Sequence, residues 1–249
     1  MGINQTPPAA LTARVGELWQ YLARAVGFAP GLSVAVSPGS YLCPPGWVGI
    51  VVLGDAVLAT APDPETARSV EQGLSGLSAA SLTDTEALRR RLPVADVMGP
   101  AALAYLDPAE FRPQPGGFSV RPVGLDHPDF RRFVLAAASF DVAESGIEEI
   151  STAAFAVLEH GQVVAAAGYR NWPRETAHLN VLTAAAARGR GLARAAASAA
   201  VARAIEEGRL PQWRARPLAS RRVARALGFR ELGFQVSIRL ATAATSREG

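Results

Sequence analysis

The sequence contains no lysine, one cysteine and three histidines among its 249 residues. Without lysine, the chain lacks the Gly-Lys-Ser/Thr string of a P-loop, which excludes a P-loop nucleotide hydrolase. The single cysteine, Cys43, excludes an intrachain disulfide. The three histidines, His127, His160 and His178, are too far apart in sequence to form a helical or hairpin pair of metal ligands. We therefore expect no metal site.

Long apolar runs are also absent, because no stretch approaches the roughly 20 residues that a membrane-spanning helix needs. The first ten residues, MGINQTPPAA, lack the charged segment and apolar core of a secretory signal. Hydrophobic residues make up 49% of the chain and charged residues 19%, which is typical of a globular protein. These features predict a cytoplasmic protein with no membrane partner.

Charge is distributed unevenly along the chain, although the net charge is only +3. Residues 188–239 contain twelve arginines and three acidic residues, whereas residues 1–187 contain twelve arginines and eighteen acidic residues. A cationic C-terminal part suits an anionic ligand. Nucleic acid is the competing ligand class. No helix-turn-helix, zinc-finger or RNP pattern accompanies the arginines, and aromatic residues do not alternate with them, so we do not expect a nucleic-acid partner.

A strand, a loop and a helix are predicted in residues 177–208, where the β-branched run HLNVLT precedes small residues, RGRGLA and an alanine-rich segment. Gly191 has no Cβ, so an anion can approach the main chain there. The backbone N–H groups and the dipole at a helix start attract negative charge. Arg188 and Arg190 add forked cationic donors. The pattern therefore predicts a phosphate-binding loop. Arg194 stands where a dinucleotide-binding fingerprint needs its third glycine, which argues against that motif.

The order Arg-x-x-Gly-x-Ala between a strand and a helix resembles the acetyl-CoA pyrophosphate loop of the GNAT N-acetyltransferase superfamily. Other segments of residues 118–240 follow the same order of elements. They are the strand FSVRPV, the helix DHPDFRRFVLAAAS, a hairpin turning at His160-Gly161, the strand LPQWRAR, the helix SRRVARALGF and the strand ELGFQVSIRL. The resemblance implies an α/β (α+β) fold with a mixed, strongly twisted central sheet flanked by helices.

Two prolines and two glycines in FRPQPGGFS (111–119) indicate a boundary between two units. We expect an N-terminal α+β lobe over residues 1–115, whose role the sequence does not disclose, and a GNAT-like domain over residues 116–249. In the first lobe, the spacing of apolar residues predicts a helix over residues 11–26, and Gly54-Asp55 predicts a hairpin within residues 47–61. Capping residues predict two further helices, DPETARSVEQGL and TDTEALRRRL. The N-terminal lobe could be a degenerate copy of the same fold, but no clear internal repeat supports that reading.

The resemblance implies acetyl-CoA as the cofactor and assigns its binding to the end of one strand, the motif loop and one helix residue. These residues are Val181, Leu182, Thr183, Arg188, Gly189, Arg190, Gly191, Leu192, Ala193 and Ser220. The pantetheine would lie between the parallel strands HLNVLT and PQWRAR, which splay apart in this family. A main-chain N–H near Leu182 or Thr183 would then polarise the thioester carbonyl.

The usual catalytic side chains of the family are missing. The place of its glutamate base is Ala177, and the place of its tyrosine acid is Ala224. We therefore assign the base role to Glu148 and Glu149, in the segment that borders the acceptor in similar proteins, with His178 as the alternative. Tyr169 is the only tyrosine after residue 110, and its position in a strand favours a packed role.

From these features we predict an acyl-CoA-dependent N-acyltransferase that transfers acetyl from acetyl-CoA to the amine of a small molecule or peptide. The acidic balance of residues 1–187 favours a cationic amine. The alternative is a non-catalytic acyl-CoA-binding or regulatory protein, because both usual acid/base residues are absent. The sequence leaves the acceptor and the oligomeric state open, with a homodimer among the options.

Overall fold

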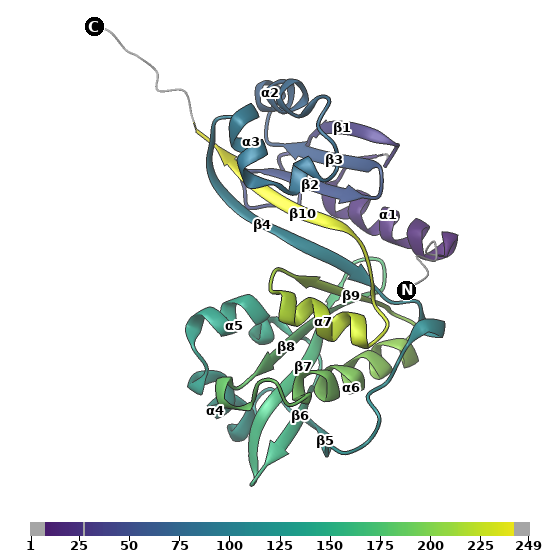
Figure 1. Cartoon of the computed structure of the whole chain (residues 1–249), viewed down its shortest axis with the longest axis vertical. Helices are drawn as coiled ribbons and strands as arrows, with labels where there is room; N and C mark the ends of the chain where they lie inside the picture. Colours follow the sequence, from purple (N-terminus) through teal and green to yellow (C-terminus); the bar gives the residue numbers. More distant parts are fainter. Residues whose placement is uncertain (1–7, 27, 242–249) are drawn as a thin grey trace, which may run out of the picture. The chain divides into compact units, whose positions relative to one another are not determined.

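The computed structural model describes residues 8–26 and 28–241 (Figure 1). Their contacts divide the chain into two compact units. The motif unit consists of residues 8–11 and 104–231, and the second unit of residues 12–26, 28–103 and 232–241. Three helices or strands, α1 (Ala9–Ala23), β4 (Val94–Tyr105) and β10 (Arg230–Leu240), contribute residues to both.

A mixed sheet forms the centre of the motif unit, with neighbouring strands in the order β9-β8-β7-β6-β5. These strands are β5 (Val120–Val123), β6 (Ala154–Glu159), β7 (Gln162–Trp172), β8 (Thr176–Thr183) and β9 (Leu210–Ala215). The pairs β5·β6, β6·β7 and β7·β8 are antiparallel, whereas β8 and β9 are parallel. The mixed sheet and its flanking helices confirm the expected α/β class.

Four α-helices and short 3₁₀ turns complete the motif unit in the described part of the chain. The helices are α4 (Pro128–Ala136), α5 (Ser139–Ser145), α6 (Leu192–Glu206) and α7 (Leu218–Ala226). The 3₁₀ turns are η2 (Pro108–Glu110), η3 (Ile147–Glu149) and η4 (Ala185–Ala187). The helix α6 begins at a left-handed glycine, Gly191, and its last turn is followed by another, Gly208.

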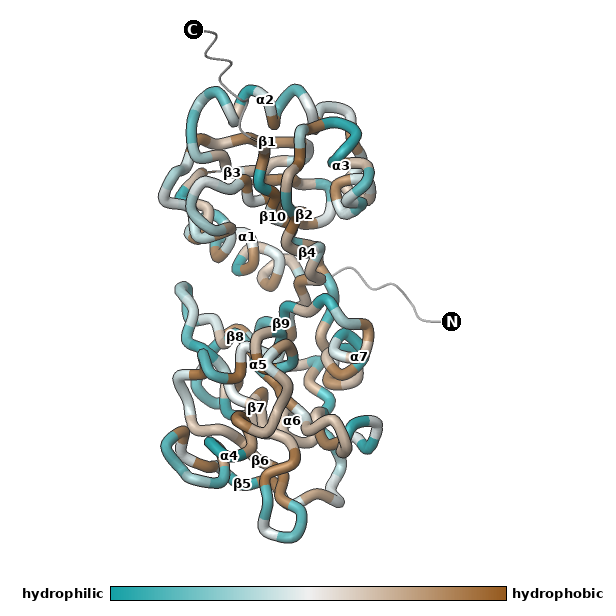
Figure 2. Tube along the Cα trace, turned by 90° about the vertical axis from the view of Figure 1, so that its left-hand side faces the viewer, coloured by the Kyte–Doolittle hydropathy of each residue, from teal (hydrophilic) through white to brown (hydrophobic). Residues whose placement is uncertain are grey.

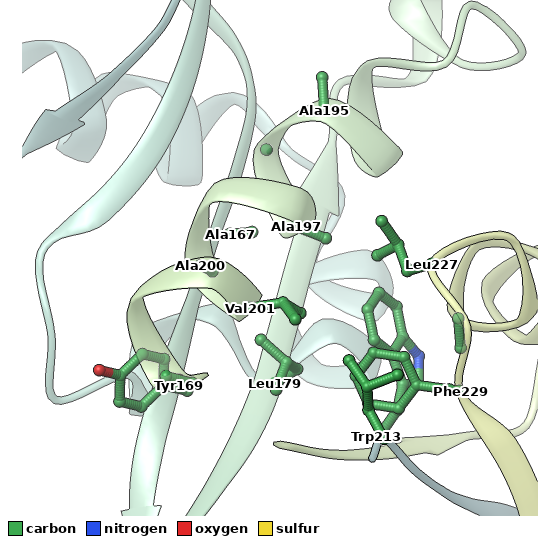
Figure 3. Packing of buried hydrophobic residues seen from close by; sticks show 14 of the residues in the cluster. Ala167, Tyr169, Leu179, Ala195, Ala197, Ala200, Val201, Trp213, Leu227 and Phe229 are labelled. Atoms are coloured by element: carbon green, nitrogen blue, oxygen red, sulfur yellow. The ribbon is translucent and has the colours of Figure 1, made fainter. Parts of the chain in front are cut away.

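Helix α6 packs through small side chains onto one face of this sheet (Figure 3). Ala196, Ala197 and Ala200 are fully buried, so the helix can lie close to the strands. Figure 3 shows Val201 of α6 near Leu179 of β8. Trp213 of β9 and Phe229 meet edge to face, with ring centroids 5.5 Å apart. This packing fixes the start of α6 against the end of β8, where the predicted loop lies.

The opposite face of the sheet carries a separate apolar core. Phe130 and Phe133 of α4 pack there with Ile147 of η3 and with Leu182 of β8. Side chains alternate between faces along a strand. Leu179 and Leu182 of β8 therefore belong to different cores.

In the second unit, neighbouring strands follow the order β1-β3-β2-β10-β4. Its other strands are β1 (Gly31–Val36), β2 (Val48–Leu53) and β3 (Ala56–Ala61). Its helices besides α1 are α2 (Pro64–Leu74) and α3 (Thr85–Arg91), with the 3₁₀ turn η1 (Ser81–Thr83). Figure 2 shows brown, hydrophobic colouring along β2 and alternating teal along α2, as a buried strand and a surface helix require.

Most of the predicted elements are confirmed. The hairpins turn at Gly54-Asp55 and at His160-Gly161, where all but Asp55 have positive φ. The residue that caps α4 is His127, whose Nδ1 accepts from the Asp129 N–H. Val26, the last residue of the helix predicted over residues 11–26, is 96% exposed because α1 ends at Ala23.

Strand β10 pairs antiparallel with β2, from Gly233 opposite Leu53 to Ile238 opposite Val48. The compact units therefore differ from the expected ranges 1–115 and 116–249, since residues 232–241 group with the second unit and residues 104–115 with the motif unit. The assignment of functional domains stays a prediction. Among the described residues, no helix is long and apolar enough to cross a membrane.

Candidate functional site

The predicted loop connects the end of β8 to α6 through η4. The Ala184 N–H donates to the Val164 carbonyl oxygen at 2.9 Å, which anchors the exit of the strand. Gly189 and Gly191 then adopt φ of +78° and +83°. This left-handed conformation costs a residue with a Cβ roughly 1–2 kcal/mol, so glycine is required at both positions for a physical reason. The nearest atom to a Cβ built on Gly191 is Phe118 Cε2 at 3.8 Å, so a Cβ there would meet the Phe118 ring in ordinary van der Waals contact, without a clash.

The N–H groups of residues 189–194 have no hydrogen-bond acceptor within the described ranges. Gly191 is the N-cap of α6, and no side chain caps this helix. The first regular bond is donated by the Ala195 N–H to the Gly191 carbonyl oxygen at 3.1 Å. A row of unpaired N–H groups at a helix start can bind an anionic oxygen.

Both loop arginines are paired with carboxylates. Arg188 Nη2 lies 2.7 Å from Asp141 Oδ2, and Arg190 forms two bonds to Glu159, at 2.9 and 2.5 Å. Hydrogen bonds from Arg190 lower the pKa of Glu159, and the same contact raises the pKa of Arg190. The arginine side chains are about half exposed, so these pairs are weak and can exchange. In this structure the main chain, rather than the guanidinium groups, is therefore ready for an anion.

The β8–β9 ladder pairs only three positions, and it ends where His178 faces Gln212. Both strands continue beyond this point, β8 to Thr183 and β9 to Ala215. Val181, Leu182 and Thr183 thus lie on a stretch of β8 that no longer pairs with β9. The hydroxyl of Thr183 is buried and has no partner among the described residues. This end of the parallel pair has free main-chain edges next to the loop.

Buried polar side chains gather where the ladder ends. His178 Nδ1 donates a short hydrogen bond to Gln212 Oε1, which fixes the tautomer because a carboxamide oxygen only accepts. Trp172 stacks on the His178 ring, with centroids 4.2 Å apart. The Arg214 guanidinium carbon lies 5.8 Å from the centroid of the Trp172 ring. Asn180 Nδ2 donates to the Ser145 carbonyl oxygen at 3.0 Å.

His178 is poorly suited to the base role that the sequence analysis gave it as an alternative. Burial, and then the nearby positive charge of Arg214, lower the pKa of His178 to about 3. A base of such low pKa has little driving force for taking a proton from an ammonium group. Its bonded partner Gln212 and its stacked partner Trp172 indicate a fixed, neutral ring.

Glu148 and Glu149 lie in η3 and are exposed. Glu149 Oε2 accepts from Arg170 Nη1 at 2.8 Å. The segment adjoins β8, because a Cβ built on Gly146 would lie only 2.5 Å from Asn180 Nδ2. The two carboxylates thus stand on a turn beside the strand that carries Val181 to Thr183, and both are open to solvent.

Four other positions from the sequence analysis have clear structural roles. Ser220 lies inside α7 and does not cap it, and its hydroxyl oxygen accepts from Trp213 Nε1 at 3.0 Å. Ala177 and Ala224 are buried in the same apolar core as Ala196, Ala197 and Ala200 of α6, which we call the α6 core. Tyr169 is fully buried, and its hydroxyl donates to Glu207 at 2.7 Å. Burial and this carboxylate raise the pKa of Tyr169 to about 12, which confirms the packed role.

Three residues of this group, Asn180, Gln212 and Trp172, were not predicted as site residues from the sequence. The available signal was the alternation of the polar residues Thr176, His178 and Asn180 with apolar residues along this strand. Polar side chains at alternate positions of a buried strand share one face. The partner Gln212 comes from a strand 34 positions further along the chain, so the sequence alone did not connect them.

Comparison with known proteins gave one family match and several structural similarities. Residues 151–233 match the family model described as GNAT acetyltransferase. A GNAT-family protein from Novosphingobium aromaticivorans is 22% identical, with TM-score 0.43, covering 60% of this chain and 67% of that one. An acetyltransferase from the GNAT family of Colwellia psychrerythraea is 14% identical, with TM-score 0.47 and coverage of 78% and 81%. A GCN5-related N-acetyltransferase from Kribbella flavida is 15% identical, with TM-score 0.44 and coverage of 66% and 65%. No curated protein gave a significant match.

Proposed function

Because residues 151–233 match the GNAT acetyltransferase family model, we propose that this protein is an acyl-CoA-dependent N-acyltransferase that uses acetyl-CoA and an amine. The matched segment contains β7, β8, the loop, α6, β9 and α7. It therefore includes every proposed cofactor-binding residue.

The observation that carries this proposal is the row of unpaired N–H groups in residues 189–194. Coenzyme A carries a pyrophosphate, which needs several hydrogen-bond donors and a favourable electrostatic field. Gly191 has no Cβ, so a phosphate would approach the main chain there, and Arg188 and Arg190 would supply charge after exchanging their carboxylate partners. The unpaired edge of Val181 to Thr183 would bind the pantetheine, which has amide groups of its own.

The reaction would form a bond between the acceptor nitrogen and the acetyl carbon and break the bond from that carbon to sulfur. The amine must lose a proton before or during attack, and the departing thiolate must gain one. Glu148 or Glu149 would take the amine proton, directly or through water, since both stand beside β8. An N–H near Leu182 or Thr183 would polarise the carbonyl. The source of the proton for the thiolate is solvent in this proposal.

The alternative function is binding of acyl-CoA without catalysis, which is favoured by the alanines at the two usual acid/base positions. Both residues are alanines buried in the α6 core, so neither supplies an ionisable group near the loop. The carboxylates of Glu148 and Glu149 in η3 argue against this alternative, because they offer a general base. A cytoplasmic location, a homodimer and a cationic acceptor stay predictions from the sequence.

The experiment that separates the two functions measures thiol release from acetyl-CoA with a panel of primary amines, alongside calorimetry of acetyl-CoA binding. The proposal expects binding together with amine-dependent thiol release and an acetylated product of the matching mass. Binding without amine-dependent release for any member of the panel would favour the non-catalytic alternative. Absence of binding by a folded protein would contradict both.

A further inference from the structure

Two buried carboxamides next to the end of the β8–β9 ladder each have an atom with no hydrogen-bond partner among the described residues. These atoms are Asn180 Oδ1 and Gln212 Nε2. Asn180 is 4% exposed and Gln212 is fully buried. A buried polar group without a partner costs about 1–3 kcal/mol, so such groups are rare and call for a reason.

The other half of each carboxamide is fixed by the protein. Asn180 Nδ2 donates to the Ser145 carbonyl oxygen, which can only accept, so the oxygen of Asn180 must be the atom left over. Gln212 Oε1 accepts from His178, so its two amide N–H groups are left over. The side chains are thus held in place, and one buried acceptor and one buried amide nitrogen are left without a partner among the described residues.

The position of these atoms points to the reaction centre. His178 and Asn180 are two residues apart on β8 and share the face opposite α6, and Gln212 faces His178 across the ladder. Asn180 lies two residues beyond the last paired position of the parallel ladder, which is the position that contains Gln212. Asn180 directly precedes Val181, the first residue of the proposed cofactor edge. On its other side it touches the segment that leads to Glu148 and Glu149.

We propose that Asn180 and Gln212 bind the acceptor molecule, with Asn180 Oδ1 accepting a hydrogen bond from the attacking amine and Gln212 Nε2 donating one to an oxygen of the same molecule. This inference rests on the proposed N-acyltransferase function and specifies its substrate class. The class consists of amines that carry a hydroxyl or carbonyl oxygen close to the nitrogen. An acceptor of this kind satisfies both buried atoms at once, whereas a simple alkyl amine leaves the Gln212 amide unpaired.

A matched pair of probes tests the substrate class. Ethanolamine and propylamine have the same size and differ by a hydroxyl against a methyl group. The measured quantity is kcat/KM for thiol release from saturating acetyl-CoA, corrected for the neutral fraction of each amine. The wild-type protein should prefer ethanolamine by about tenfold or more, since a site built to hydrogen-bond an oxygen discriminates against an analogue without it. Equal rates would overturn the assignment of Gln212.

Variants assign the preference to each side chain. Gln212→Met should reduce the ethanolamine preference to near unity, whereas a purely structural role would lower both rates together and leave the ratio unchanged. Asn180→Leu should lower kcat/KM for both amines by about 10–100-fold and leave acetyl-CoA affinity within about twofold. Gln114→Met is the matched control. Its carboxamide oxygen is also buried without a described partner, but the segment bonds to Ser198 in the middle of α6, so both rates should stay unchanged.

The outcomes separate this inference from the proposed function. If the wild-type protein releases thiol with amines but Asn180→Leu, still folded by its thermal transition, keeps the wild-type rate, the inference is wrong and the function stands. Binding of acetyl-CoA with no reaction of either probe also overturns the inference, while other amines can still support the function. Failure of acetyl-CoA to bind overturns the proposed function itself.

Discussion

His178 and Gln212 are hydrogen-bonded to each other at the last paired position of the parallel β8–β9 ladder. The bond joins two buried polar side chains, and the Trp172 ring covers the histidine from one side. The pair lies where the strands stop pairing and the free edge of β8 begins. We therefore regard it as the structural support of the proposed acceptor site, rather than as its base.

The first prediction concerns pH and stability. The pKa of His178 is about 3 in the folded protein and near 6.5 in an unfolded chain, so the unfolded state binds the proton more readily. The stabilising effect of the neutral ring is complete above about pH 6.5 and declines as the pH falls towards 3. Between these two pH values, protonation of His178 in the unfolded chain lowers the free energy of unfolding by about 1.4 kcal/mol for each unit by which the pH falls. Denaturant unfolding at several pH values measures the slope.

His178→Phe should remove this component of the slope, since phenylalanine still stacks but cannot take a proton. His160→Asn is the matched control, because His160 is exposed in a turn with positive φ that asparagine tolerates. The control should keep the wild-type slope. A wild-type slope in the His178→Phe protein would contradict the assignment of the low pKa to this residue.

The loop and both hairpin turns were predictable because their signals are local. Gly54-Asp55, His160-Gly161 and the glycines around Arg190 determine the backbone over a few residues. Strand β4 was missed because Gly99-Pro100 interrupts its pattern, and α5 because it has only seven residues. An interrupted strand pattern and a seven-residue helix are each hard to distinguish from a loop in a single sequence.

The side-chain partners in the site depend on tertiary structure, which the sequence did not determine. The Arg190–Glu159 pair joins the loop to the end of β6, 31 positions earlier, and the sequence analysis took this arginine as free for phosphate. The same holds for the Arg188–Asp141 pair, since Asp141 lies in the helix that was not predicted. Strand register and helix placement decide such contacts.

A second prediction tests the loop arginine. Glu159→Gln should raise the affinity for coenzyme A by about two- to fivefold at low salt, because Arg190 no longer has a charged competitor for the phosphate. Calorimetric titration measures the change. Glu206→Gln, at the far end of α6, removes a carboxylate near Arg203 and should leave the affinity unchanged. Weaker or equal binding by Glu159→Gln would show that Arg190 does not meet the ligand.

A third prediction concerns the proposed base. Glu148→Gln combined with Glu149→Gln should lower kcat for an amine that the wild-type protein accepts by about 10²–10⁴-fold, since this is the usual contribution of a general base. Acetyl-CoA affinity should change little, because neither residue belongs to the loop. The rate is measured across pH, and the double variant should lose the acid limb of the profile. Glu206→Gln again serves as the control for an exposed carboxylate.

If the double variant keeps both the rate and the pH profile of the wild type, the η3 carboxylates are only solvated surface groups. A loss of rate that comes with a matching loss of acetyl-CoA binding would equally contradict the base role, because it would indicate damage to the fold. The two single variants then show which carboxylate carries the effect.

A fourth prediction separates packing from catalysis at Tyr169. Tyr169→Phe removes the buried bond to Glu207 and should lower the free energy of unfolding by about 1–2 kcal/mol. The rate of acetyl transfer should stay the same, since the hydroxyl lies in the α6 core with a pKa of about 12. Thermal unfolding and the thiol-release assay give the two readings. A large fall in rate at unchanged stability would instead identify Tyr169 as the missing acid.

The proposed function requires that the main chain at Gly191 binds the pyrophosphate of coenzyme A. Gly191→Glu adds bulk and negative charge at this position of the loop. Its matched control is Gly208→Glu, because Gly208 also has positive φ, with open space around it, but lies after the other end of α6. Both variants thus carry similar backbone strain and the same charge.

The most direct measurement is calorimetric titration of coenzyme A into the wild-type protein and these two variants, with folding checked by thermal unfolding. We expect the wild type and Gly208→Glu to bind with similar affinity and Gly191→Glu to show no measurable binding. Binding of coenzyme A by folded Gly191→Glu with wild-type affinity would contradict the account.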